Sequence, residues 1–146
     1  LVVGKPAAMM LDRENATVTL CNSRTRDLPA LCREADVLVV AMGRRGAIGA
    51  DCLREGQVVV DVGIHVNEEC KLCGDVRFDE AEPIVEAITP VPGGVGTVTT
   101  SVLVGHVVDA AFATVHESGL LFPESLSHYP RTSIYIRSRT IQINRK

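Results

Sequence analysis

The chain has 146 residues, 46% hydrophobic and 23% charged, which is typical of one globular domain with a true core. Aromatic residues make up only 3% and Trp is absent, so the core must be built from Val, Leu, Ile and Ala. The net charge of −3 gives no indication of nucleic-acid binding. No uninterrupted run of about 18 apolar residues occurs, so the sequence predicts no membrane span and no membrane partner.

The cysteines favour free thiols over a disulfide framework, because their number is odd and their spacing scattered. They are Cys21, Cys32, Cys52, Cys70 and Cys73. Free thiols indicate a reducing compartment. The Cys70–x–x–Cys73 pair is compatible with a redox pair or with half of a zinc site. No second CxxC or HxxxH follows it, so we expect no metal.

Short helical patterns alternate with apolar, β-branched runs along the chain. In chain order they predict a helix over 7–13, a strand over 16–21, a helix over 28–35, a strand over 36–42, one helical turn over 50–54, a strand over 57–62, a polar connection over 67–74, a helix over 79–87, a short strand over 88–91 and a long helix over 97–117. The continuous apolar runs at 36–42 and 57–62 are typical of parallel strands buried on both faces. In the long helix, Val98, Val102, Val108, Ala111, Phe112 and Val115 form an apolar stripe.

This alternation predicts an α/β fold, a Rossmann-like doubly wound parallel sheet with right-handed crossovers. Ligands of such sheets bind outside the carboxyl ends of the strands. The loops that matter are therefore residues 22–26, 43–46, 63–66 and 90–96.

Read together, these segments resemble the bifunctional methylenetetrahydrofolate dehydrogenase/methenyltetrahydrofolate cyclohydrolase family, in its C-terminal NAD(P)-binding domain. The resembling strings are VGKP at 3–6, NATVT at 15–19, CNSRT at 21–25, ADVLV at 35–39, GQVVVDVGI at 56–64, KLCGDV at 71–76 and ITPVPGGVG at 88–96. The last string is the most specific. The resemblance extends from the first residue to the end of the long helix.

The chain departs from the family pattern at three places near the expected ligands. Thr97-Val98-Thr99 replaces the family's Pro-Met-Thr, Asn22 stands where His is frequent, and His65 stands where Asn is frequent.

The resemblance also implies parts that would precede Leu1: a first strand with a Gly-Arg-Ser phosphate turn, and a domain carrying the catalytic Lys. We therefore predict a nucleotide-binding domain over 1–119 that is incomplete at its N-terminus and lacks its first strand. A divergent basic tail, disordered or a loosely placed strand, would occupy 120–146. Loss of a central strand would expose the edges of its two neighbours, so we expect this chain to fold poorly alone.

The loop after the second strand of the complete domain is the candidate cofactor-phosphate site. In NAD-binding folds an acid there accepts hydrogen bonds from the ribose. Here Ser23, Arg24 and Thr25 supply hydroxyls and a cation, which suit the 2′-phosphate of NADP. A solvated polar loop is the alternative, and NAD remains possible. The resemblance adds Gly43, Gly63 and Ile64 to the cofactor-binding set. Asp61 is expected to cap backbone groups, and Arg44 and Arg45 either shield the pyrophosphate or form an exposed basic loop.

The bend before the long helix is the best site candidate, because its prolines fix φ and its glycines free it. Such a bend brings backbone groups close to a flat ligand, and a helix N-terminus follows it. A structural turn is the alternative. The resemblance assigns this bend to the folate, with substrate-binding residues Pro92, Gly93, Gly94, Val95, Gly96 and Thr99.

By resemblance, the whole enzyme would oxidise 5,10-methylenetetrahydrofolate by hydride transfer to NADP and hydrolyse the methenyl product to 10-formyltetrahydrofolate. Its partner would be the tetrahydrofolate substrate, it would form a homodimer, and its location would be cytoplasmic or mitochondrial. No catalytic residue is expected in this segment, which alone would be inactive. The alternatives are a truncated, non-catalytic isoform that binds nucleotide or dimerises, and an unrelated NAD(P)-dependent dehydrogenase, which the 90–96 string disfavours.

Overall fold

The computed structural model describes residues 2–117 and 140–145, with side chains over 2–114. The helices are α1 (Gly4–Arg13), α2 (Leu28–Glu34), the single 3₁₀ turn η1 (Ala50–Cys52), α3 (Phe78–Ala81) and α4 (Val95–Glu117). The strands are β1 (Thr17–Cys21), β2 (Val37–Ala41), β3 (Val58–Asp61), β4 (His65–Val66), β5 (Leu72–Cys73), β6 (Ala87–Ile88) and β7 (Thr140–Arg145). These residues form two compact units, divided between Gly96 and Thr97, and β7 belongs to the first.

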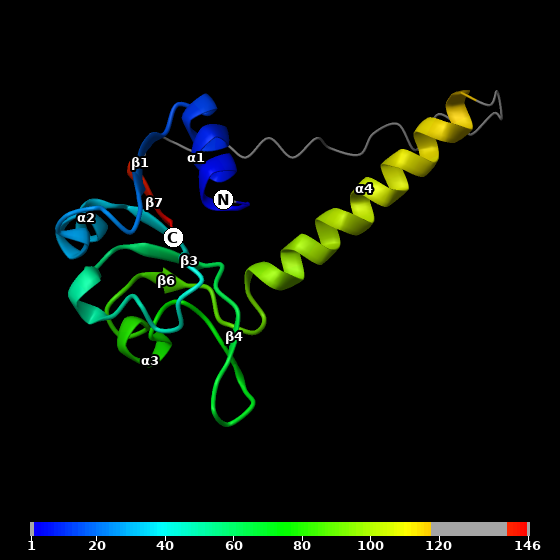
Figure 1. The fold of residues 1–146 in the computed structure, drawn as a ribbon. Coiled ribbons are helices and arrows are strands. Elements are labelled where there is room, and N and C mark those ends of the chain that lie inside the picture. The colour runs from blue at the N-terminus through cyan, green and yellow to red at the C-terminus, as the bar shows by residue number, and fades with distance from the viewer. Residues whose placement is uncertain (1, 118–139, 146) are drawn as a thin grey trace. The chain divides into compact units, whose positions relative to one another are not determined.

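The first unit is built on a five-stranded parallel sheet in the order β1-β7-β2-β3-β6 (Figure 1). At its centre Val37 pairs with Val58 and Val39 with Val60, so the two apolar runs of the sequence lie side by side. Helices connect the strands and cover them, as parallel pairing requires. The predicted α/β class and parallel sheet are confirmed.

Strand β7 lies between β1 and β2, where the resemblance located a strand preceding Leu1. Thr17 pairs with Thr140 on one side, and Val37 pairs with Ile141 on the other. The edges of β1 and β2 that we expected to be exposed are therefore both paired. The β-branched composition of the segment TIQINR suits this position. The part of the basic tail over 120–139, including its β-leaning run at 132–136, lies outside the described residues.

Local predictions differ from the structure in their bounds: the strand predicted over 88–91 is β6, which ends at Ile88, and the long helix predicted from residue 97 begins at Val95. Helix α1 begins at Gly4, before the start at residue 7 that the sequence predicted. The polar connection over 67–74 contains β5, which forms a two-residue antiparallel ladder with β4, so that His65 pairs with Cys73. Such a short ladder gives no periodic signal in the sequence. Helix α3 ends at Ala81, well before residue 87, and Pro83 follows it closely.

The core lies against the sheet and contains the aliphatic residues that its composition predicted. Its buried members are Cys32, Leu38, Val40, Ile48, Cys52, Leu53, Val59, Val76 and Ala81. Alternate residues of β2 and β3 are fully buried, which fixes the register of both strands. A smaller cluster around Ala8 and Ala16 packs α1 onto the other face.

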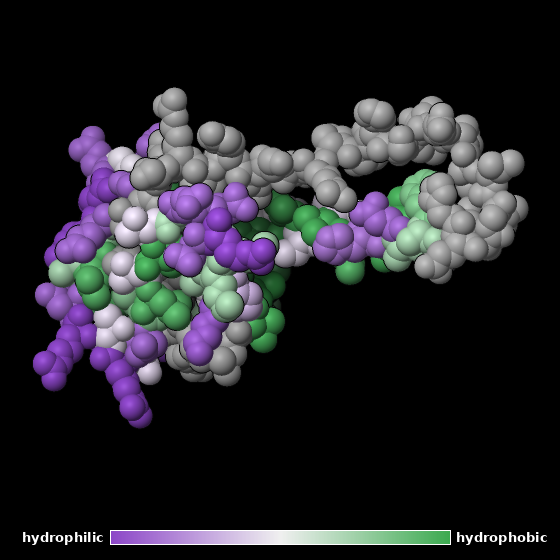
Figure 2. All heavy atoms as spheres, turned by 90° about the horizontal axis from the view of Figure 1, so that it is seen from above, coloured by the Kyte–Doolittle hydropathy of each residue, from purple (hydrophilic) through white to green (hydrophobic). Residues whose placement is uncertain are grey.

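The second unit contributes α4, whose apolar side chains are largely exposed among the residues described. Val98 is 60% exposed, Val102 49% and Val108 46%. Figure 2 shows hydrophobic and hydrophilic side chains together on this helix. The segment Val95–Thr114 is long and apolar enough to cross a membrane by length and composition, although our sequence criterion found no such segment. Its polar Thr, Ser, His and Asp residues interrupt every continuous apolar run. A single helix of this kind is weak support for a span.

Candidate functional site

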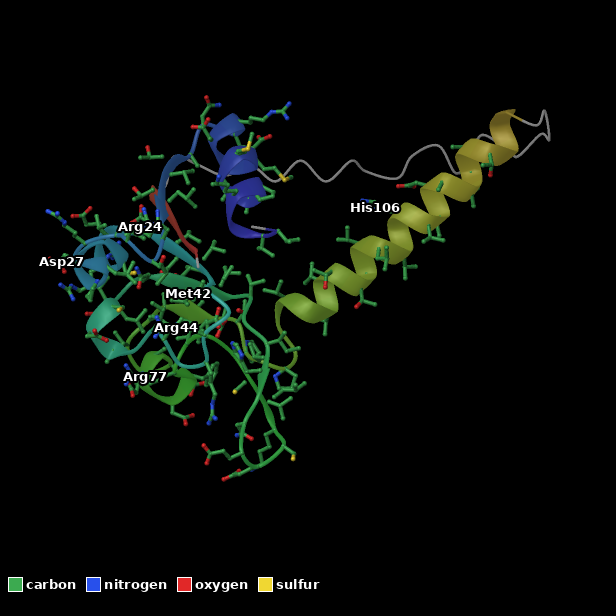
Figure 3. All side chains as sticks on the ribbon, viewed as in Figure 1. Arg24, Asp27, Met42, Arg44, Arg77 and His106 are labelled. Atoms are coloured by element: carbon green, nitrogen blue, oxygen red, sulfur yellow. The ribbon has the colours of Figure 1, made fainter. Side chains whose placement is uncertain are left out.

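The loop that follows β1 is a turn closed by its own polar groups. Asn22 N–H donates to Thr25 Oγ1 at 2.8 Å, and Arg24 N–H donates to Asn22 Oδ1 at 2.9 Å. These contacts hold Ser23 and Arg24 at the tip of the turn, where both are exposed, as Figure 3 shows for Arg24. No salt bridge among the described residues uses the Arg24 guanidinium. The turn therefore offers a hydroxyl and a cation to an anionic group at the sheet edge.

The loop that follows β2 is fixed from inside the protein by Asp75. Asp75 Oδ2 accepts hydrogen bonds from Met42 N–H at 2.6 Å and Gly43 N–H at 2.8 Å, and Oδ1 accepts one from Arg44 N–H at 2.8 Å. Gly43 has φ +62°, a conformation that favours glycine. The Arg44 and Arg45 side chains are exposed, as Figure 3 shows for Arg44.

The loop that follows β3 carries Gly63, Ile64 and His65. A Cβ on Gly63 would lie 2.4 Å from Asp75 N, so only glycine permits this close approach. Ile64 is 69% exposed, which leaves an apolar side chain available to a ligand at this edge. His65 turns inward, and its Nε2 lies 2.7 Å from Asp75 Oδ1.

Asp61, at the end of β3, caps backbone groups as expected. Its carboxylate is buried and accepts hydrogen bonds from Gly63 N–H at 2.8 Å, Asp75 N–H at 3.1 Å and Val76 N–H at 2.9 Å. Burial raises the pKa of Asp61, the three N–H donors oppose that rise, and the nearby Asp75 charge adds to it. Asp61 thus has a structural role at the base of the site.

The bend after β6 has the stiff, side-chain-poor backbone that the sequence predicted. The Val91–Pro92 peptide bond is cis, and Gly93 has φ +102°. A Cβ on Gly94 would lie 2.5 Å from the Pro90 carbonyl oxygen, so this position also requires glycine. A Cβ added at Gly96 would meet no atom within 4 Å. The bend runs directly into α4, which begins at Val95.

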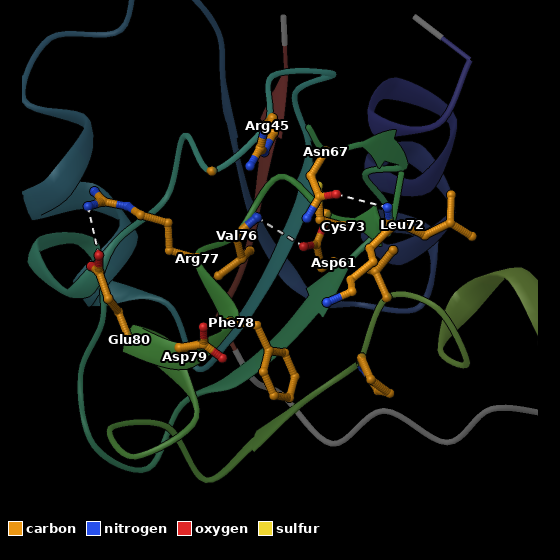
Figure 4. A pocket seen from close by; sticks show the side chains of 15 residues that line it. Arg45, Asp61, Asn67, Leu72, Cys73, Val76, Arg77, Phe78, Asp79 and Glu80 are labelled. Atoms are coloured by element: carbon orange, nitrogen blue, oxygen red, sulfur yellow. Dashed lines mark hydrogen bonds and ion pairs between the residues drawn. The ribbon is translucent and has the colours of Figure 1, made fainter. Parts of the chain in front are cut away.

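A cleft of about 640 Å³ lies in the first unit beside these loops (Figure 4). It is lined by Arg45, Gly46, Asp61, Asn67, Lys71, Leu72, Cys73, Gly74, Val76, Arg77, Phe78, Asp79, Glu80, Pro90 and Val91. Two of the predicted loops contribute to it, through Arg45 and Gly46 of 43–46 and Pro90 and Val91 of 90–96, whereas the residues predicted to bind the cofactor or the folate directly do not line it. The Arg77 guanidinium on its wall pairs with Glu80 at 2.9 Å.

The parallel sheet brings most of the predicted site residues to one edge, because the loops after β1, β2, β3 and β6 all follow carboxyl ends. Ser23, Arg24, Thr25, Gly43, Gly63 and Ile64 lie in the first three of these loops, and Pro92 to Gly96 follow the fourth. Thr99 belongs to the second unit and is described only as an exposed residue of α4.

Sequence reasoning missed Asp75, which contacts two of these loops. Its motif, Gly74-Asp75-Val76, was part of the resembling strings, but an acid between two short elements gave no signal of its role. The cysteines Cys70 and Cys73 are free thiols, one exposed and one half-buried. Within the described ranges, no cluster of His, Cys, Asp or Glu has the composition of a metal site.

Comparison with known proteins places this geometry in a family. The family described as tetrahydrofolate dehydrogenase/cyclohydrolase, NAD(P)-binding domain, matches residues 1–115. The bifunctional protein FolD of Carboxydothermus hydrogenoformans is 61% identical over 112 residues, which cover 75% of this chain and 39% of that protein. FolD 1 of Rubrobacter xylanophilus is 58% identical over 110 residues, with coverages of 75% and 39%.

Two solved structures have the same fold. The FolD methylenetetrahydrofolate dehydrogenase/cyclohydrolase of Campylobacter jejuni superposes with a TM-score of 0.73 at 43% identity, over 77% of this chain and 40% of that one. A 5,10-methylenetetrahydrofolate dehydrogenase of the silkworm Bombyx mori gives a TM-score of 0.62 at 38% identity, over 70% and 35%. The chain thus spans about two fifths of the length of these relatives. By sequence and by fold, it belongs to the tetrahydrofolate dehydrogenase/cyclohydrolase family, as the NAD(P)-binding domain.

Proposed function

We propose that this chain is the NAD(P)-binding part of an enzyme that oxidises 5,10-methylenetetrahydrofolate to methenyltetrahydrofolate and hydrolyses that product to 10-formyltetrahydrofolate. The observation that carries the proposal is the cluster of strand-end loops at one sheet edge, in a chain that belongs to the NAD(P)-binding family. Two bifunctional FolD proteins are 61% and 58% identical over the matched region, and the Campylobacter jejuni enzyme whose name gives both activities is 43% identical.

The donors in the loop after β1 fit NADP better than NAD. Ser23 and Arg24 present a hydroxyl and a guanidinium, and no acid stands in this turn to repel a 2′-phosphate. The nicotinamide end would lie against Gly63 and Ile64, whose exposed side chain supplies an apolar contact. When bound, NADP⁺ supplies the hydride acceptor, and the residues of this chain hold and orient it.

The bend formed by Pro92, Gly93, Gly94, Val95 and Gly96 would form one wall of the folate cleft, and Thr99 stays a separate prediction of a substrate contact. The support for this wall is steric: a Cβ added at Gly96 would meet no atom within 4 Å, so a flat ring can approach the peptide group there closely. No general acid or base is assigned within the described residues. The catalytic Lys of the family is expected outside this chain.

The same domain would mediate a homodimer in a reducing compartment, cytoplasmic or mitochondrial, where its free cysteines stay reduced. A non-catalytic isoform that binds nucleotide or dimerises is the second candidate, and the lack of an assigned catalytic residue favours it for the chain taken alone.

Two measurements on the purified 146-residue chain test the proposal. Isothermal titration should show NADP⁺ binding that is tighter than NAD⁺ binding. A dehydrogenase assay with 5,10-methylenetetrahydrofolate should show no turnover. Absence of binding for both nucleotides at millimolar concentration refutes the cofactor assignment, and turnover by this chain contradicts the assignment of the catalytic Lys elsewhere.

A further inference from the structure

Asp75 is the only fully buried acid among the described residues, and it lies in none of the loops assigned to the cofactor. Its carboxylate accepts hydrogen bonds from three successive backbone N–H groups, those of Met42, Gly43 and Arg44, at 2.6 to 2.8 Å. Three contacts from consecutive peptide groups fix both the position and the orientation of the turn after β2.

The same carboxylate also holds the loop after β3. His65 Nε2 lies 2.7 Å from Asp75 Oδ1, and an ionised carboxylate can only accept that hydrogen bond. The backbone of Gly63 is so close that an added Cβ would lie 2.5 Å from Asp75 Cγ. The Asp75 backbone is fixed in turn, because its N–H donates to Asp61 Oδ1 at 3.1 Å.

Successive N–H groups aimed at one point form a typical anion-binding concavity. In this turn the concavity is filled by the protein's own carboxylate, so the N–H groups of Met42, Gly43 and Arg44 are not available to a nucleotide phosphate. The turn after β2 therefore presents its outer surface to a ligand. The hydrogen bonds to Asp75 on its inner side determine the shape of that surface.

We propose that Asp75 is a positioning residue of the nucleotide site, which locks the Gly43 turn and the Gly63–Ile64 turn into one rigid edge without touching the nucleotide. The inference rests on the proposed function, because it assumes that these two turns contact the cofactor. A merely structural role would instead spread the effect of losing Asp75 over the whole sheet.

The test compares Asp75→Asn with the control Asp12→Asn, which makes the same charge change at an exposed position on α1. Asp75→Asn keeps the size of the side chain but removes its charge. It also replaces one acceptor oxygen by an amide donor that faces the backbone N–H groups. We expect NADP⁺ affinity to fall about tenfold or more, the effect of losing one charge-assisted hydrogen bond. Hydrogen exchange by NMR should accelerate at the amides of 42–44 and 63–66 and stay unchanged within β2 and β3.

Asp75→Asn overturns the proposal if NADP⁺ affinity stays within about twofold of wild type, or if exchange accelerates uniformly over the sheet. If Asp75→Asn does not fold, the same measurements are made on His65→Ala, because this substitution removes only the contact between Asp75 and the Gly63–Ile64 turn. Faster exchange at 63–66 with weaker NADP⁺ binding then supports the proposal, and unchanged values for both overturn it. If the wild-type chain binds no NADP⁺, the proposed function fails. Hydrogen exchange in Asp75→Asn then decides alone: faster exchange confined to 42–44 and 63–66 supports the coupling of the two turns by Asp75, and faster exchange over the whole sheet overturns it.

Discussion

Replacing Gly74 by Ala should destabilise the protein strongly, because no space exists for a side chain beside the buried carboxylate of Asp61. A Cβ on Gly74 would lie 1.9 Å from Asp61 Oδ2 and 2.5 Å from Asp61 Cγ. Either the carboxylate or the backbone must move. Asp61 cannot move without lengthening its hydrogen bonds from Gly63, Asp75 and Val76.

The magnitude follows from those bonds. A hydrogen bond to a charged group contributes about 1.5–3 kcal/mol, and a shift large enough to relieve the overlap disrupts at least two of them. We expect a loss of about 3–6 kcal/mol in the free energy of unfolding. Domains of this size have total stabilities of about 5–15 kcal/mol, so the variant would be near its unfolding threshold.

Urea unfolding followed by circular dichroism measures this loss, and Gly56→Ala is a matched control in the same unit. Gly56 has φ +73° and only the Arg54 guanidinium near its Cβ position, at 3.9 Å, so Ala there meets backbone strain but no overlap. That strain costs about 1–2 kcal/mol. The reasoning is refuted if Gly74→Ala loses no more stability than Gly56→Ala.

Four further predictions concern other groups. Since the folded-state pKa of Asp61 lies above its ordinary value of 3.8, this group stabilises the fold below pH 3.8, and that contribution is lost as pH rises through the folded value. In urea titrations, the stability of wild type relative to Asp61→Asn should therefore fall as pH rises from 3.8 to the folded-state pKa of Asp61. A stability difference that does not change with pH would contradict the pKa shift. Arg24→Ala should weaken NADP⁺ binding about tenfold and leave NAD⁺ binding nearly unchanged in calorimetry, whereas equal losses would remove the 2′-phosphate assignment. Deleting 140–146 exposes the inner edges of β1 and β2, and should abolish the cooperative thermal transition; a retained transition would show that β7 is dispensable. Because burial raises the pKa of the Cys21 thiol, that residue should react with a disulfide reagent only after unfolding, while exposed Cys70 reacts at once; similar native rates would contradict the burial of Cys21.

The order of the elements could be predicted from the sequence, because parallel strands buried on both faces consist of continuous runs of apolar residues. Residues 36–42 and 57–62 were assigned to strands in this way, and β2 and β3 lie within those bounds. The glycine positions at 63, 93 and 94 were also predictable, since close approach or positive φ restricts them to glycine. Strands and glycine positions could thus be predicted where the structural requirement depends on residues that are close together in the sequence.

The parts that could not be predicted depend on contacts between distant segments. Asp75 is separated by more than thirty positions from the turn it holds, and nothing near it in sequence indicates three N–H donors. His65 was noted as a departure from the family pattern near the expected ligands, but its pairing with Asp75 required the fold. The exposure of Val98 and its neighbours on α4 likewise could not be predicted from the apolar stripe. An apolar stripe indicates that a helix face favours burial, but it does not identify the surface that would cover that face.

The central position of β7 has a consequence for how the protein acquires its structure during synthesis. Residues 140–145, which bridge β1 and β2, are synthesised after every other strand of the sheet, so the two halves of the sheet stay unjoined until those residues have been made. Closing so long a loop is slow, and unpaired strands stay open to other chains in the meantime. Expression yield should therefore respond more to temperature and chaperone supply than the stability of the finished protein would suggest.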